Sequence, residues 1–220
     1  IRDSPYILVS LVLTLIFALG CHGAIRKHAG AFYALAVLIV VAEVLYYQLG
    51  WRDAAPEWLT DHIVNPFKRG ALSTAMFMVI MYVGALDAKR PAVRKLMGVR
   101  GQLSIIACIL TLGHNIIYGK KHFVMLFTNP AEMKPQTMAA AIISIVMIAV
   151  MIPLMVTSFK TIRGKMRGGD WKKLQRLAYV FFGLIYVHVM VLFIPKFEKK
   201  WMDIVPVSYT HLRAHETGAY

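Results

Sequence analysis

The chain has 220 residues, of which 58% are hydrophobic and 16% are charged, and its mean hydropathy is +0.59. A soluble domain usually carries about 25% charged residues, so this composition excludes an ordinary water-soluble enzyme and favours one helical membrane domain. The formal net charge of +14 does not indicate a nucleic-acid partner, because the basic residues fall between apolar runs, where they act as topology signals. Cys21 and Cys108 have no CxxC or Cys/His metal spacing, so neither a disulfide framework nor a zinc site is expected.

A membrane-spanning helix needs roughly 17–25 mostly apolar residues. Six segments meet or approach this length, which predicts an all-α polytopic bundle of about six transmembrane helices surrounded by membrane lipid in a cell (inner or plasma) membrane. Pro153, inside the fifth segment, is expected to kink it, which neighbouring helices tolerate. In chain order the segments are 6–20, 29–49, 71–86, 102–118, 137–159 and 177–194.

The connections after the third and fifth segments are the richest in lysine and arginine, and the one after the first carries Arg26 and Lys27 with no acidic residue, whereas acidic residues weaken the positive charge of the others. Because positive residues accumulate in cytoplasmic loops, we expect these three connections in the cytoplasm and the N-terminus outside. The third connection contains Lys89, Arg90, Arg94, Lys95 and Arg100. The fifth contains Lys160, Arg163, Lys165, Arg167, Lys172, Lys173 and Arg176.

The final stretch, 207–220, reads VSYTHLRAHETGAY; it is polar, lacks helical periodicity and looks like a translated sequencing adapter. We exclude it from fold reasoning together with its His211 and His215. We expect an incomplete N-terminus, since the chain opens at Ile1, and a native continuation past Asp203 into another span. The predicted organisation is two N-terminal helices and an outer loop in 1–64, a transmembrane core in 65–206 and a non-native tail in 207–220.

Ionisable side chains within apolar segments are costly in a bilayer and mark functional sites. Three stand out: His114 in the fourth segment, His188 in the sixth and Glu43 in the second. His114 lies 14 residues beyond Arg100 and His188 lies 12 beyond Arg176. At the helical rise per residue, these are about 21 and 18 Å from the inner edge. The two imidazoles therefore reach one level in the outer half, which suits axial haem ligands; depth alone leaves unrelated histidines or a proton relay open.

Two stretches of the sequence resemble a known family. VRKLMGVRGQLSIIACILTLGHNIIYG, at 93–119, and WKKLQRLAYVFFGLIYVHVMVLF, at 171–193, are similar to the ferric-reductase-like transmembrane domain family. Within it, the likeness is closest to the haem-binding membrane subunit of bacterial periplasmic methionine sulfoxide reductase systems. The likeness covers roughly 65–193. It implies that 65–206 is a haem-binding core in which His114 and His188 ligate haem b, and that the outer partner is a reductase.

The sequence departs from the family at a second, inner pair of positions. Where family members carry further histidines, this chain has Gly101 and Gln175, and glutamine is not a usual haem ligand. The resemblance therefore implies one haem, in the outer half, and gives no support to an inner haem or an inner flavin contact.

Glu43 lies about 24 Å beyond Lys27, close to the histidine level. It can hold an imidazole N–H as a partner of a haem ligand, pass a proton, or be a protonated glutamate bonded to Tyr46 or Tyr47.

Other polar and sulfur-containing residues receive no functional role. Cys108 is expected to be a small buried residue, and the Met147, Met151 and Met155 stripe is expected to pack in the core. Lys120 and Lys121 can snorkel to the interface or meet haem propionates. The histidines assigned to segment ends or loops are His22, His28, His62 and His122, of which His122 is the reserve ligand.

These observations predict a b-type cytochrome that takes electrons from a quinol or flavin donor at the inner side and delivers them to an extracytoplasmic acceptor or partner reductase. No catalytic residue is assigned, because the chain has no GxGxxG and no soluble domain to hold a nicotinamide or flavin. The alternative is a proton-coupled transporter or structural membrane subunit in which His114, His188 and Glu43 form a relay.

Overall fold

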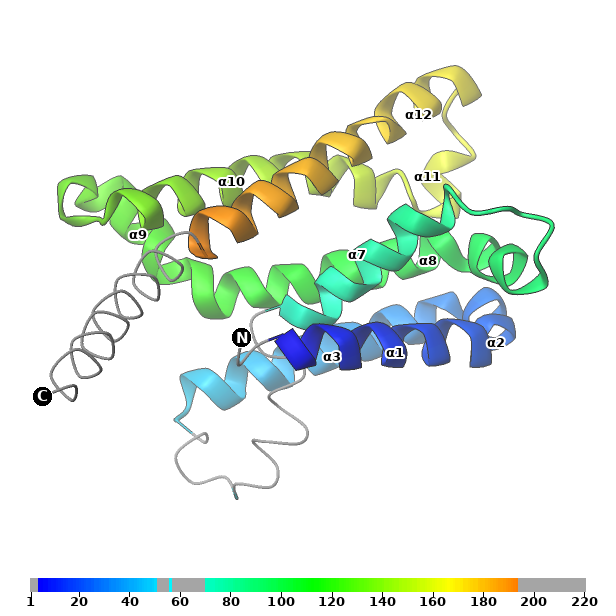
Figure 1. Ribbon diagram of the computed structural model, residues 1–220, viewed down its shortest axis with the longest axis horizontal. Helices are drawn as coiled ribbons and strands as arrows, with labels where there is room; N and C mark the ends of the chain where they lie inside the picture. Colours follow the sequence, from blue (N-terminus) through cyan, green and yellow to red (C-terminus); the bar gives the residue numbers. More distant parts are fainter. Residues whose placement is uncertain (1–3, 51–55, 57–69, 194–220) are drawn as a thin grey trace, which may run out of the picture.

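The computed structural model describes residues 4–50, 56 and 70–193. Within these ranges the chain is all-helical and contains no strand. The long helices lie roughly along one axis, and consecutive long helices run in opposite directions (Figure 1). His62 and the 207–220 tail lie outside the described residues.

The helices follow the apolar runs of the sequence. The N-terminal ones are α1 (Ser4–Gly20), α2 (His22–Lys27), α3 (Ala29–Gln48) and α7 (Ala71–Val83). The central ones are α8 (Pro91–His114), the π-helix η3 (Asn115–Gly119), α9 (Lys120–Thr128) and the 3₁₀ turn η4 (Pro130–Glu132). The last are α10 (Pro135–Val156), α11 (Lys160–Arg163) and α12 (Gly168–Gln175), after which a helix continues over 177–193.

Four helices in the described part of the chain are long and apolar enough to cross a membrane: Ala29–Gln48, Pro91–Thr128, Pro135–Val156 and Gly168–Phe193. Two more, Ile7–Gly20 and Ala71–Val83, are apolar but shorter. The 13 residues of α7 are about 20 Å long, less than the roughly 30 Å of a hydrocarbon core. The all-helical class and apolar membrane helices are thus confirmed, while six spans stay a prediction.

Helix α8 is the centre of the bundle. Half of the residues in its most apolar stretch are buried, whereas only 6% are buried in the corresponding stretches of α3 and of the helix that ends at Phe193. Its middle residues Ile106, Ala107 and Cys108 pack in one core cluster with Phe77 of α7 and Phe181 of the last helix. In the described part of the chain, large apolar side chains of α1, α3 and the last helix are exposed, as a lipid environment allows.

One boundary differs from the sequence expectation. The helix that begins at Pro91 does not end at 118 but continues through η3 and α9 to Thr128, 38 residues in all. Lys120 and Lys121 were expected to end the segment, yet lysine is a good helix former and its long side chain can reach a polar layer from a helix. His122 consequently lies in a helix and not in a loop.

The two ends of the bundle differ in charge. At one end, on the right of Figure 1, lie α2, the connection before α8, and α11 with α12. We call this the basic end. The α9 end is the opposite one, on the left. Cations in the last turns at the basic end are Arg26, Lys27, Lys160, Arg163, Lys172 and Lys173.

Candidate functional site

His114 is the last residue of α8, immediately before the π-helix. Gly70, which precedes α7, packs against its ring: a Cβ at this glycine would lie 3.3 Å from Cγ and 3.4 Å from Nδ1 of His114. Gly70 also has φ +73°, a left-handed conformation that favours glycine. Two features therefore favour glycine at position 70: its left-handed backbone conformation and its close contact with the His114 ring.

The Nδ1 atom of His114 is buried and has no hydrogen-bond partner within the described residues. On another side, the ring lies 5.2 Å from the ring of Tyr118, centre to centre. The Tyr118 hydroxyl donates to the Tyr47 hydroxyl at 3.2 Å, which ties this region to α3. A buried imidazole nitrogen without a partner is rare and calls for a water, an ion or a cofactor nearby.

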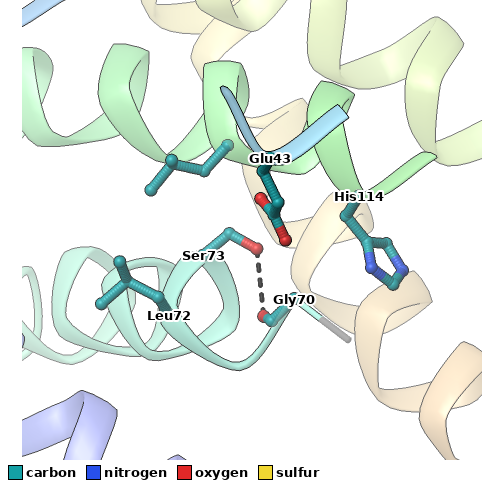
Figure 2. Close-up of a pocket in the computed structure, with 6 residues that line it drawn as sticks. Glu43, Gly70, Leu72, Ser73 and His114 are labelled. Atoms are coloured by element: carbon teal, nitrogen blue, oxygen red, sulfur yellow. Dashed lines mark hydrogen bonds between the residues drawn. The ribbon is translucent and has the colours of Figure 1, made fainter. Parts of the chain in front are cut away.

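Glu43 of α3 reaches the same place. It lines a small cavity of about 10 Å³ with Gly70, Ser73 and His114, closed on the apolar side by leucines. Figure 2 shows the Glu43 carboxyl pointing toward Gly70 and Ser73, with the His114 ring alongside and a hydrogen bond from Ser73 Oγ to the Gly70 carbonyl. Three helices therefore bring a carboxyl, a hydroxyl and an imidazole to one cavity.

A close helix crossing fixes this arrangement. A Cβ at Gly113 would lie 2.8 Å from Cγ1 and 3.0 Å from Cγ2 of Val40, so only glycine allows α3 to approach α8 so closely. Glu43 follows Val40 by three residues and His114 follows Gly113 by one. Residues three apart share a helix face, so the crossing turns Glu43 toward His114 and away from lipid.

His188 lies in the helix 177–193 and is half-buried. Its Nδ1 lies 3.4 Å from Oγ of Ser144 in α10, and this hydroxyl donates to the Ala140 carbonyl. With the proton on Nδ1, this contact leaves the lone pair of Nε2 available to a metal. Helices α8 and 177–193 run in the same direction (Figure 1), so each carries its histidine toward the α9 end.

The two positions where the family has further histidines lie near the basic end, around the C-terminus of α10. Gln175 Nε2 donates to Thr157 Oγ1 at 3.3 Å, and Trp171 Nε1 donates to the Thr157 carbonyl at 3.1 Å. A Cβ at Gly101 would lie 3.8 Å from the Ser158 carbonyl. Trp171 and Gln175 therefore both hydrogen-bond the residue that follows α10.

The remaining sequence candidates fall into three places. Met151 is 1% exposed, and Met147 and Met155 pack against the same core cluster, so this stripe fills the core as expected. Cys108 is buried. His122, in α9, has a buried Nδ1 without a partner in the described part of the chain. Among the described residues no three His, Cys, Asp or Glu side chains form a group that could hold a metal ion alone.

Sequence reasoning missed Gly70, Ser73 and Gly113, which build the site without carrying its chemistry. Two signals point to them in retrospect. Gly70 lies directly before an apolar run, where a left-handed residue can start a helix, and Gly113 directly precedes an intramembrane histidine. Small residues in membrane helices commonly mark close helix contacts.

No family model and no solved structure matches the chain. A protein of Treponema pallidum (strain Nichols), described as uncharacterized, is 34% identical over 203 residues, or 92% of this chain. The chain spans about half the length of this relative, 55%. The relative's description carries no activity, so the likeness to ferric-reductase-like membrane domains stays an expectation from the sequence.

Proposed function

We propose that the chain is the haem-binding core of a membrane electron-transfer protein, a b-type cytochrome in which His114 and His188 would hold the haem iron. The observation that carries the proposal is that two helices running in the same direction each carry a histidine toward the α9 end, one with a buried, unpartnered Nδ1 and one with its Nδ1 next to Ser144 Oγ. Haem commonly takes imidazole as an axial ligand, and bundle cores are where such cofactors lie. Bound there, the haem would supply reversible one-electron transfer.

The donor atoms fit this group. Ser144 Oγ lies next to Nδ1 of His188, which is the usual arrangement of a metal-ligating histidine with Nε2 toward the metal. Nδ1 of His114 is buried without a partner among the described residues, which supports a water or a ligand next to this ring. Glu43 stands beside it and can orient the ring.

We infer one haem and not two. Gln175 and Trp171 both donate hydrogen bonds to Thr157, so ordinary hydrogen bonds hold the inner level of the bundle together.

Electrons from a quinol or flavin donor would arrive from this basic end. By the positive-inside rule we expect the basic end in the cytoplasm, with the protein crossing the inner or plasma membrane six times. The acceptor would be an extracytoplasmic molecule or partner reductase. Labelling of a cysteine at Arg94 in intact cells by a membrane-impermeant reagent would reverse this direction.

The test is the spectrum of the purified chain from haem-replete cells. We expect a reducible low-spin b-type spectrum with about one haem per chain, lost or turned high-spin in His114→Ala and His188→Ala. Added imidazole should restore the low-spin spectrum in each variant, which separates loss of a ligand from misfolding. His122→Ala, which removes another histidine with a buried nitrogen, is the matched control and should keep its haem.

A proton relay is the second candidate, and the polar cavity shared by Glu43, Ser73 and His114 favours it. The two functions predict opposite results. A colourless preparation, or a spectrum unchanged by both histidine substitutions, would defeat the cytochrome and favour proton transfer.

A further inference from the structure

The cavity beside His114 has the size and the polar lining of a site for one molecule. Its volume is about 10 Å³, close to the least that holds a water. A buried water usually makes about three hydrogen bonds to polar groups that otherwise lack partners. The lining offers the carboxyl of Glu43, the hydroxyl of Ser73, the carbonyl of Gly70 and the orphaned Nδ1 of His114.

We propose that one buried water links Nδ1 of His114 to the Glu43 carboxyl and that Glu43 thereby acts as a positioning residue for the histidine. The Nδ1–H of His114 donates to the water. The water donates one hydrogen to a Glu43 oxygen and the other to Ser73 Oγ, whose own hydrogen goes to the Gly70 carbonyl. The buried Nδ1 of His114, which has no partner among the described residues, then has one.

The arrangement gives the two histidines different environments. The neutral hydroxyl of Ser144 contacts His188 directly, whereas a carboxyl holds His114 through the water. Hydrogen bonding of an imidazole N–H to a carboxyl raises the basicity of the opposite nitrogen and fixes the ring. His114 is therefore the stronger electron donor to a bound metal, and its contribution depends on Glu43.

This inference rests on the proposed function only for its redox consequence. If His114 holds a haem, a more basic imidazole would favour the oxidised form of its iron, because hydrogen bonds to a ligating histidine tune haem potentials. Glu43→Leu should keep the haem and raise its midpoint potential. Ser73→Val, which fills the cavity and leaves Glu43 in place, should raise it as well if a water carries the link. Glu43→Gln keeps an acceptor oxygen and should give the smaller shift.

Glu132→Gln is the matched control, because it removes a carboxyl from the exposed η4 turn at the same end of the bundle. It should leave the potential unchanged. A haem-loaded Glu43→Leu protein with the wild-type potential would overturn the inference while the cytochrome stands. A shift in Glu43→Leu without one in Ser73→Val would replace the water by a direct contact.

A second readout needs no haem. In protein with ¹⁵N-labelled histidine, the His114 Nδ1–H resonance, identified by its absence in His114→Ala, should move in Glu43→Leu and in Ser73→Val. It should stay in place in Glu132→Gln. An unmoved resonance in both cavity variants refutes the water bridge even if the chain binds no haem, so failure of the inference and failure of the proposed function remain distinguishable.

Discussion

The α9 end and the basic end of the bundle treat their buried polar groups in opposite ways. At the basic end, Trp171 and Gln175 both donate to Thr157, and Arg163 lies over the Trp171 ring at 4.2 Å. At the α9 end, His114 and His122 each have a buried nitrogen without a partner in the described part of the chain.

Leaving a buried polar group unpaired costs roughly 1–3 kcal/mol. Among the described residues this cost falls at the α9 end, and a water, an ion or a ligand commonly satisfies such groups. At the basic end, the hydrogen bonds of Trp171 and Gln175 tie the last helix to the end of α10. Substitutions at the two ends should therefore differ in what they change, as well as in how much.

The largest effect is expected from Gly113→Ala. The new Cβ would lie 2.8 Å from Val40 Cγ1, and overpacking of this kind costs roughly 1–3 kcal/mol. Thermal unfolding in detergent should show the loss, and any bound haem should weaken because α3 and Glu43 are pushed from His114. Adding Val40→Ala should recover much of it.

Gly183→Ala, in the last helix, is the control for this substitution, because a Cβ there meets nothing within 4 Å. Alanine is the better helix former by about 1 kcal/mol, so this variant should be as stable as the wild type or more so. Equal melting temperatures for Gly113→Ala and Gly183→Ala would mean that the helix crossing at Val40 is not tight.

A smaller loss is expected from Gly70→Ala, and Gly50→Ala is its matched control. Both glycines have positive φ, 73° and 72°, so alanine at either costs roughly 1–2 kcal/mol of backbone strain. Only at Gly70 does the added Cβ meet the His114 ring, since Gly50 has open space. Haem content or the His114 resonance should change in Gly70→Ala alone. Identical behaviour of the two would remove Gly70 from the site.

The smallest effect is expected from Gln175→Leu at the basic end. It removes one hydrogen bond to Thr157, which is worth about 1 kcal/mol, and leaves the α9 end untouched. Melting temperature should fall slightly while the haem spectrum stays the same. A changed spectrum would show that the two ends are not separate in function. Gln175→His tests the reverse, because a histidine there can recruit a second haem.

The helices could be predicted from the sequence because hydropathy and length determine them locally. Spacing from flanking cations also predicts the levels of His114, His188 and Glu43 along the membrane normal. Level says nothing of direction around the helix axis. Whether Glu43 faces lipid or His114 depends on the Gly113–Val40 crossing, which joins residues far apart in the chain.

The helix around Lys120 and Lys121 extends beyond the apolar segment predicted at 102–118. Charge near the end of an apolar run predicts where the membrane ends, which is not where the helix has to end. Backbone hydrogen bonds within a helix continue in either environment, so α9 extends the helix beyond that point. The partner of His114 could not be predicted either, since Gly70 contacts it only through the packing of α7 on α8.

The π-helix between His114 and α9 sets an angular register. A residue added to an α-helix rotates everything after it by about 100°, and the wider turn at Asn115–Gly119 absorbs such an offset within a continuous helix. Deleting one residue there would swing α9 round by that angle relative to α8. An apolar groove of about 350 Å³, lined by residues of α8, η3, α9 and α10, would lose its shape while His114 kept its own position. The wide turn thus lets one continuous helix direct two faces independently. The α8 part faces the interior of the bundle, and the α9 part faces α10.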